Sequence, residues 1–406
     1  MAARTVLVLG GGVGGIAAAN ELRQRLQPSD RVVVIERAQR SVFQPSLLWL
    51  MVGRRRPDDI SRPMRQMLAG GVDLVQADVL AVDPVGRVVE TSVGRHVADA
   101  LVVALGAELA PDAADGFADA AHDIYTLEGA AGVARSLDGF RGGRVVVAVA
   151  GLPFRCPAAP YEAALLLDDA LRRRGVRTST EIDLYTPEPQ PMPVAGPTLG
   201  AAVTDLLEAR AIRYHPTTPI VRYEPASREI VLATGDRVAY DLLVGIPPHR
   251  PPAALRDSGL TGETGWVPVD RRTLRSSVEG VWAVGDVTAI ALANGKLLPK
   301  AGVFAHEEAL VAADHVATAL GRPASGRVFA GEGSCWLETG SGRAAFAVGD
   351  FYAEPNPTVS LRQPGRLWHA GKVLFERYSL ASGLERRLEA VALRSATRLL
   401  GLRAPL

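Results

Sequence analysis

The chain has 406 residues, enough for two or three domains, and an apolar share of 48% with 5% aromatic residues is typical of a globular α/β protein. Its 45 basic and 44 acidic residues leave a formal net charge of +1, which gives no electrostatic footprint for nucleic acid. The longest apolar runs hold about ten residues, too few for a membrane span.

The N-terminus runs directly into a predicted strand at residues 5–9, so we expect no signal peptide and a cytoplasmic location. The chain has two cysteines, Cys156 and Cys335. In a cytoplasmic protein, two cysteines do not favour a structural disulfide, and by default they would be two unrelated buried thiols. The sequences around them favour a joint role instead.

The first motif is a glycine-rich loop between the strand at residues 5–9 and a helix predicted over 16–26. A second strand, 31–35, ends at an acidic residue about twenty positions further on, as in a dinucleotide fold. We expect Gly10 to make the tight turn, Gly12 to admit the pyrophosphate, and Gly15 to let the helix pack on the strand. The candidate dinucleotide ligands are Gly10, Gly12, Val13, Gly14, Gly15, Glu36 and Arg37.

Two later segments favour FAD as the dinucleotide. Residues 99–107 resemble the connecting segment of flavoproteins with two dinucleotide folds, and residues 278–286 resemble their strand that ends in Gly-Asp. In those flavoproteins the aspartate of the second segment lies on the FAD ribitol, so we expect Asp286 there. The additional candidate FAD ligands are Ala104, Gly106, Gly285 and Asp286.

A second strand and helix are predicted at residues 143–150 and 160–174, but the loop between them lacks a nucleotide fingerprint. It has one glycine and two prolines, and prolines have no N–H to offer a phosphate. Cys156 stands just before the helix, where N–H groups and the helix dipole favour a thiolate. Glu162 in the first turn is a candidate proton shuttle, or simply an acid favoured by the dipole.

The segments around the two cysteines are more specific for a protein family than the glycine motif. Residues 153–162 and 331–338 resemble the two redox-cysteine motifs of sulfide:quinone oxidoreductases and of flavocytochrome c sulfide dehydrogenase flavoprotein subunits. Residues 280–288, 298–305 and 372–378 resemble further segments of the same group. The resemblance implies a redox-active disulfide between Cys156 and Cys335, attacked by hydrosulfide, with two electrons ending on FAD and then on quinone.

The resemblance also has gaps with consequences. Residues 41–46 hold no cysteine where the flavocytochrome group tethers its flavin, so non-covalent FAD is expected. Tyr125 stands where many relatives have a third cysteine. Lys300 and Gly302 lie at a helix start that, in the family, points at the flavin; the alternative for Lys300 is a solvated surface lysine.

The electron acceptor is expected at the C-terminal part of the chain. Phe346, Phe375 and Lys372 match family segments that line a quinone pocket, although isolated aromatic residues are more often core. A helical stripe with basic residues around it favours peripheral contact with the inner face of the cell membrane over packing on the protein or on a dimer partner. The stripe comprises Leu380, Leu384, Leu388, Val391, Leu399 and Leu402.

The predicted fold is therefore α/β with two Rossmann-like, glutathione-reductase-like domains, the second with a degenerate nucleotide site, followed by a C-terminal segment with an amphipathic helix. We expect a discontinuous FAD domain at 1–110 and 241–320, a second domain at 111–240 and a C-terminal domain at 321–406, in a homo-oligomer. The histidines show no metal-ligand spacing, and no metal is expected. Alternatives are a sulfide dehydrogenase that passes electrons to a cytochrome c, an enzyme acting on another thiol or sulfur carrier, and a non-catalytic redox sensor.

Overall fold

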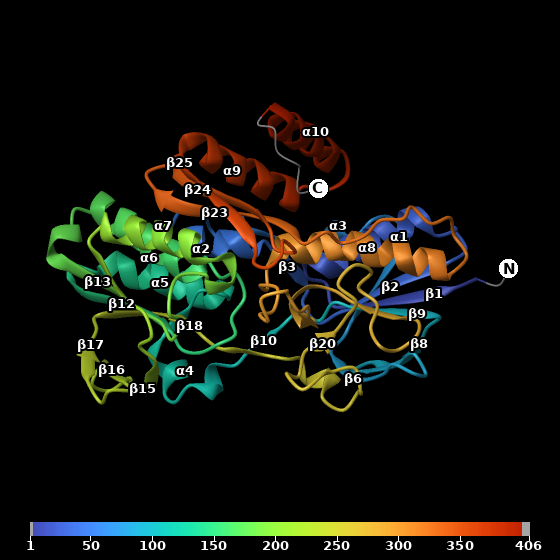
Figure 1. Ribbon diagram of the computed structural model, residues 1–406, viewed down its shortest axis with the longest axis horizontal. Coiled ribbons are helices and arrows are strands. Elements are labelled where there is room, and N and C mark those ends of the chain that lie inside the picture. The colour runs from blue at the N-terminus through green and yellow to red at the C-terminus, as the bar shows by residue number, and fades with distance from the viewer. Residues whose placement is uncertain (1–2, 400–406) are drawn as a thin grey trace.

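A computed structural model describes residues 3–399 and confirms the α/β fold class. Figure 1 shows two lobes side by side, with the C-terminal strands and helices lying across their upper face. Each lobe contains a five-stranded sheet. The first sheet has the strand order β21(Val281–Ala283), β9(Ala100–Val103), β1(Thr5–Leu9), β2(Arg31–Glu36) and β5(Val72–Gln76). The second has the order β11(His122–Asp123), β18(Leu242–Ile246), β12(Gly143–Val149), β13(Thr180–Tyr185) and β14(Ile212–His215).

All pairs within these two sheets are parallel, which explains why the strands are nearly continuous apolar runs. Successive side chains alternate between the faces, so both faces of β1 and of β12 enter separate hydrophobic clusters. Helices cover the faces. They are α1(Val13–Arg25) and α8(Gly302–Ala319) on the first sheet, and α5(Leu127–Gly139), α6(Ala159–Arg173) and α7(Pro197–Glu208) around the second.

The C-terminal segment begins with a three-stranded antiparallel sheet of β23(Glu332–Gly340), β24(Arg343–Asp350) and β25(Thr358–Gly365). Helices α9(Arg366–Leu380) and α10(Gly383–Leu399) follow. Strand β23 packs on α6 of the second lobe and also contacts α8 of the first, so this segment joins the two lobes. It therefore carries Cys335 to the junction between them.

The predicted C-terminal stripe needs one correction. It was expected as a single helical face from Leu380 to Leu402, but α9 ends at Leu380 and α10 begins at Gly383, whose φ of +55° interrupts the helical path. Leu380 is buried, whereas Leu388 and Val391 on α10 are exposed. Leu402 lies outside the described residues, and no helix within those residues is both long enough and apolar enough to cross a membrane.

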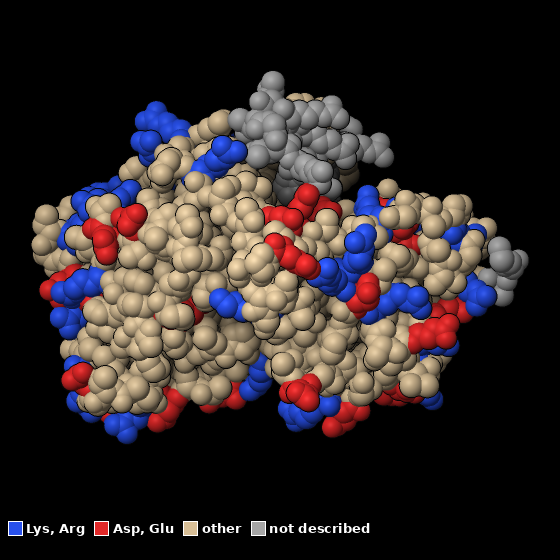
Figure 2. Space-filling view, in the orientation of Figure 1, with Lys and Arg blue, Asp and Glu red and all other residues tan. Residues whose placement is uncertain are grey.

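The remaining elements are short connections around this frame. Small antiparallel sheets are formed by β3(Arg40–Val42) with β4(Ser61–Pro63), β6(Val79–Asp83) with β7(Val88–Thr91) and β8(Gly94–Val97), β10(Glu108–Leu109) with β19(His249–Arg250), and β15(Ile220–Glu224) with β16(Glu229–Leu232) and β17(Arg237–Ala239). The short strands β20(Val267–Pro268) and β22(Thr288–Ala289) pair in parallel. The short helices include α2(Leu47–Met51), α3(Met64–Met67) and α4(Phe117–Ala120). Acidic and basic side chains are interspersed over the face in Figure 2, with no large area of one sign. The predicted domain limits stay predictions.

Candidate active site

The glycine loop joins β1 to α1 as the sequence predicts, and glycine is required at its positions for different physical reasons. A Cβ on Gly15 would lie 1.9 Å from the Gly10 carbonyl oxygen, so only glycine lets α1 pack this closely. Gly10 has a φ of +102° and would bring a Cβ within 2.3 Å of the Ala104 oxygen. A Cβ on Gly12 meets nothing within 4 Å. Gly12 is also the N-cap of α1 and gives the helix no side-chain cap, so the first-turn N–H groups receive no hydrogen bond from a capping side chain.

Acidic and glycine residues from neighbouring strands surround this loop. The Glu36 carboxylate, at the end of β2, accepts a hydrogen bond of 2.5 Å from the Gly11 N–H and another of 2.7 Å from Ala38. Arg37 is exposed beside it, and Gly14 is buried against Val284 and Ala305. Gly106 follows β9 with a φ of +68° and with open space where a Cβ would be.

A second helix start lies next to the first. Gly302 opens α8 without a side-chain cap, and a Cβ on it would lie 3.8 Å from the Val13 side chain. Gly285 donates its N–H to the buried carboxylate of Glu308, at 2.5 Å. Burial raises the pKa of neighbouring Asp286 above its usual range.

Lys300 is partly buried, and its ammonium contacts protein groups, which counts against the alternative of a solvated surface lysine. Its ammonium donates to the Asp286 carbonyl oxygen at 2.6 Å and lies 3.4 Å from the centre of the Trp266 ring. Burial lowers its pKa to about 8, against the opposing charges of Asp286 and Glu308.

These features together fit an FAD molecule. The glycine loop and the uncapped start of α1 offer N–H groups for a pyrophosphate, and the Gly12 position leaves the room that it needs. Glu36 is an acceptor for ribose hydroxyls, and Asp286 is an acceptor at the end of β21. The uncapped start of α8 and Lys300 supply positive potential for an electron-rich ring.

Cys156 lies in the loop between β12 and α6, in an unusual backbone conformation. Its φ is +55°, which is uncommon for a residue with a Cβ and marks a constrained position. Its N–H donates to the Lys300 carbonyl oxygen at 2.7 Å, and its own carbonyl accepts from Ala159 at 2.8 Å. The cysteine loop is thereby tied to the segment that leads into α8.

Cys335, on β23, meets Cys156 although 179 positions separate them in the chain. Both are free thiols in this structure, and their side chains are joined by a hydrogen bond. That bond from Cys335 lowers the pKa of Cys156, in opposition to burial, and raises the pKa of Cys335. The helix dipole favours the same direction for the pKa of Cys156, but the Cys335 hydrogen bond is the leading cause. The reduced pair therefore holds its negative charge on Cys156.

Glu162 and Lys372 form a buried ion pair beside the two thiols. The carboxylate and the ammonium are in direct contact, and the two residues are only 2% and 3% exposed. Burial raises the pKa of Glu162 to about 7, although Lys372 opposes the shift. The charges of both groups act on both cysteines. Lys372 was expected as a quinone ligand, but in this structure its ammonium pairs with the acid on the cysteine side.

Tyr125 and Arg155 contact each other on the other side of the cysteine loop. The sequence did not predict that either residue anchors this loop. The Tyr125 hydroxyl donates to the Arg155 carbonyl oxygen at 2.7 Å, and the Arg155 guanidinium lies 4.8 Å from the Tyr125 ring centre. The His249 ring packs edge-on against Tyr125, and the backbone N–H of His249 donates a hydrogen bond to the Pro153 carbonyl oxygen. Burial lowers the pKa of His249 to about 3, so its imidazole is neutral. In the sequence, only the presence of Tyr125 at the position of the relatives' third cysteine pointed to this contact.

The two expected quinone phenylalanines belong to one aromatic cluster. Trp336, next to Cys335, has its ring centre 5.2 Å from that of Phe346 and 5.3 Å from that of Phe375. Phe346 stacks on Trp368, and Phe375 packs against Phe43. Trp336, Trp368 and Phe43 were not predicted, because the contacts link β23, α9 and the segment before α2.

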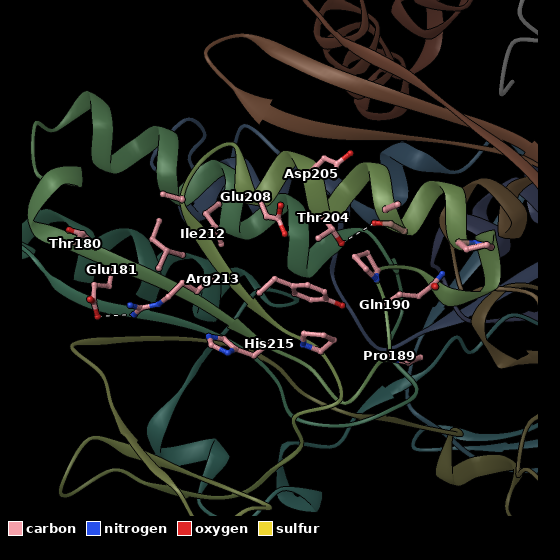
Figure 3. Close-up of a pocket in the computed structure, with 18 of the residues that line it drawn as sticks. Thr180, Glu181, Pro189, Gln190, Thr204, Asp205, Glu208, Ile212, Arg213 and His215 are labelled. Atoms are coloured by element: carbon pink, nitrogen blue, oxygen red, sulfur yellow. Dashed lines mark hydrogen bonds and ion pairs between the residues drawn. The ribbon is translucent and has the colours of Figure 1, made fainter.

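A separate cavity of about 1210 Å³ lies between α7 and the edge strand β14 (Figure 3). It contains none of the predicted site residues. Arg213 and His215 on its wall are paired with acids of β13, and neither thiol nor glycine loop reaches it. This cavity therefore lacks the groups for dithiol or dinucleotide chemistry. The described residues also contain no group of three or more His, Cys, Asp or Glu side chains placed to hold a metal ion.

Comparison with known proteins decides the family. Residues 4–309 match the family described as pyridine nucleotide-disulphide oxidoreductase. The chain belongs to this family. The family implies a flavin cofactor, so the chain is a flavin oxidoreductase. The match covers both parallel sheets and Cys156 but ends before Cys335.

Individual relatives within this oxidoreductase family extend over the C-terminal segment. The chain is 25% identical over 381 residues to the mitochondrial sulfide:quinone oxidoreductase of Mus musculus, covering 88% of this chain and 80% of that protein. It is 26% identical over 405 residues to the sulfide-quinone reductase of Aquifex aeolicus (strain VF5), covering 93% and 90%. The structure of the sulfide:quinone oxidoreductase from Aquifex aeolicus superimposes with a TM-score of 0.84 at 25% identity, covering 100% of this chain and 96% of that one.

Proposed function

We propose that this flavin oxidoreductase oxidises hydrosulfide to sulfane sulfur through a Cys156–Cys335 disulfide and passes the electrons to a quinone. The observation that carries the proposal is the contact between the two thiols at the junction of the lobes, beside the ends of α6 and α8. Two relatives that cover most of this chain are named for sulfide and quinone, which supports the same substrates here.

The protein's own residues account for the sulfur step. Hydrosulfide attacks one sulfur of the disulfide, so that a new S–S bond forms in a persulfide while the old one breaks and the other cysteine leaves as a thiolate. Glu162, with its pKa near 7, accepts the proton that the persulfide loses. FAD, when bound, accepts the two electrons and supplies them to the acceptor.

Pro153 and Pro157, with Cys156, replace the glycine fingerprint in the second lobe. Two positions of this loop therefore lack an N–H, and the N–H of Cys156 is already bonded to the Lys300 carbonyl. We infer that this lobe binds no nicotinamide nucleotide and that electrons enter from sulfur instead.

We place the quinone at the aromatic cluster of Phe346, Phe375 and Trp336, because flat rings that stack on one another also stack on a quinone ring. Helix α9 carries Phe375 of this cluster, and α9 and α10 lie at the upper edge of the molecule in Figure 1. Leu367 on α9, and Leu388 and Val391 on α10, are more than half exposed. We propose that these helices rest on the membrane surface and admit the apolar quinone from it.

Anaerobic addition of sulfide to the holoenzyme tests the reaction. We expect the flavin absorbance to bleach within one turnover and to return when a soluble quinone is added. Cys156→Ser and Cys335→Ser are expected to retain FAD and to lose sulfide-dependent bleaching, because neither can form the disulfide. Dithionite serves as the control reductant, since it bleaches the flavin without a disulfide.

The outcomes separate the alternatives. Absence of bleaching by sulfide in the wild type would contradict the proposed substrate, and full turnover in either serine variant would contradict the disulfide. If cytochrome c restores the bleached flavin absorbance and quinone does not, the electron acceptor is a cytochrome and the proposed quinone is wrong.

A further inference from the structure

Helix α9 presents a stripe of three polar residues to the protein interior. His369, Lys372 and Glu376 are spaced i, i+3 and i+7, so they lie on one face of the helix. Lys372 and Glu376 are buried, and each has an ionic partner from another element. A buried charge costs several kcal/mol unless it is paired, so a stripe of this kind needs a reason beyond packing.

The reason for Glu376 is structural. Its carboxylate accepts three hydrogen bonds of 2.7–3.1 Å from Arg55 and one of 2.5 Å from the Ser46 hydroxyl. This pairing fixes α9 against the segment around α2 and involves neither thiol.

The other two residues connect to the site through a second acid, Glu338. Glu162 accepts hydrogen bonds both from the Lys372 ammonium and from the Glu338 backbone N–H. The charge of Glu338 acts on Lys372 in turn. The lysine ammonium is therefore paired with Glu162 and feels the charge of Glu338, and its flexible stem carries three donors.

Glu338 leads onward to the surface. Its side chain is fully buried, and both of its oxygens lie 2.9–3.0 Å from Nδ1 of His369. The His369 side chain is 27% exposed. A line of four proton-exchanging side chains thus runs from the thiols to solvent, in the order Glu162, Lys372, Glu338 and His369.

Other charged and aromatic side chains surround this line. Arg54 lies 3.9 Å from Glu338 and is itself paired with Asp169 on α6 at 2.5 Å. The Trp49 ring lies under the Lys372 ammonium at 4.9 Å and edge-on to His369.

We propose that Glu338 and His369 form the outlet of a proton path that drains Glu162 after each sulfur step. The inference rests on the proposed function. The persulfide proton passes to the Glu162 carboxylate; Lys372 gives a proton to Glu338 and takes one from Glu162; His369 accepts from Glu338 and releases the proton to water. One proton leaves per hydrosulfide consumed, and each member returns to its starting charge. Glu338 and His369 act through Glu162 and are positioning residues.

The test is a stopped-flow measurement on the holoenzyme, with flavin absorbance and a pH-indicator dye followed together after sulfide is added. We expect Glu338→Gln to slow both signals by about a hundred-fold, the lower end of what acid–base groups contribute. His369→Ala is expected to slow both as well, and added imidazole is expected to restore the rate. Glu376→Gln, on the same helix face but outside the line, is the matched control: its amide oxygen can still accept from Arg55 and Ser46, so both signals should keep wild-type rates.

A second reductant separates this proposal from the proposed function. Dithiothreitol reduces a protein disulfide without sulfide, and the cysteines still exchange protons with solvent. Wild-type rates in Glu338→Gln and His369→Ala with both reductants would overturn the path, as would an imidazole effect equal in wild type and variant. If dithiothreitol gives the variant defects while sulfide bleaches nothing, the path stands and the substrate is wrong. If neither reductant bleaches the flavin, both proposals fail.

Discussion

The two parallel sheets use the same local architecture for different chemistry. In the first, β1 leads through Gly10–Gly15 into α1; in the second, β12 leads through residues 150–158 into α6. Each strand has parallel partners on both sides, β2 and β9 in one case and β13 and β18 in the other. The frames correspond, so the difference lies in the two loops.

The first loop leaves its helix start open, with no side chain at Gly12 and no cap on α1. The second fills the corresponding place with prolines and a cysteine whose backbone is bonded to the α8 segment. The comparison teaches that a helix start at the end of a parallel strand is a general site for negative charge. Glycine leaves that site open for a phosphate, whereas the second loop places a cysteine there, whose pKa is lowered chiefly by the hydrogen bond from Cys335.

The largest expected effects come from breaking the first loop. Gly15→Ala places a methyl group 1.9 Å from the Gly10 oxygen, so we expect a loss of about 3 kcal/mol in the free energy of unfolding and poor folding. Gly12→Ala meets nothing within 4 Å and should change stability by less than about 0.5 kcal/mol. Its methyl occupies the proposed pyrophosphate space, so FAD affinity should fall by about tenfold, equivalent to roughly 1.4 kcal/mol.

Thermal unfolding of the apoprotein and FAD titration check the two variants separately. A Gly12→Ala protein that binds FAD with wild-type affinity would contradict the assignment of this loop to the cofactor. Equal instability of the two apoproteins would contradict the distinction between packing and ligand access.

The second loop is tested by removing the acid beside it. The pKa of Glu162 is raised from 4.5 to about 7, so its carboxyl group is protonated below pH 7 and becomes a base only above it. The rate of sulfide-dependent flavin reduction should therefore rise through pH 7 in the wild type, and Glu162→Gln should lose that part of the rise and slow by about a hundred-fold. Hydrosulfide supply is the same in both proteins, so the difference between their profiles isolates the carboxyl group.

Two further variants control this experiment. Glu162→Gln alone leaves Lys372 buried without its partner, at a cost of about 3–5 kcal/mol, and Glu162→Gln/Lys372→Met removes both charges. Glu188 is also buried with a pKa near 7, but its carboxylate accepts a hydrogen bond from the Tyr161 hydroxyl and is not paired with Lys372. Glu188→Gln should keep the wild-type profile; if it flattens the profile and Glu162→Gln does not, the base has been assigned to the wrong carboxylate.

The contrast between the loops also explains what could be predicted from the sequence. The glycine loop is local, since its spacing and the flanking apolar runs define strand, turn and helix within about thirty residues. The cysteine loop was recognised by what it lacks and by resemblance. The spacing of leucines predicts one continuous stripe, but Gly383, which lies within it, has a positive φ and separates α9 from α10.

Contacts between distant segments were not predictable in this way. Glu162 and Lys372 are 210 positions apart, and Glu338 meets His369 only because β23 and α9 pack together. Lys300 appeared equally suited to solvent, since its burial depends on Trp266 and on the carbonyl oxygens near Asp286. Periodicity reports which face of an element is apolar, but it does not report which polar side chains from other elements share that face.

The smallest expected effect concerns how the cysteine loop is held. Tyr125→Phe removes the hydroxyl that bonds to the Arg155 carbonyl next to Cys156 and leaves that oxygen without its donor, at a cost of about 1 kcal/mol. Because the left-handed backbone at Cys156 depends on such anchors, we expect the rate of Cys156 alkylation in the reduced protein to change by roughly fivefold. Tyr223→Phe is the matched control, since the Tyr223 hydroxyl is buried and has no hydrogen-bond partner. Mass spectrometry of iodoacetamide-labelled peptides measures the rate at each cysteine. An equal change at Cys156 in both tyrosine variants would mean that the loop responds to loss of any buried hydroxyl and that Tyr125 does not anchor it.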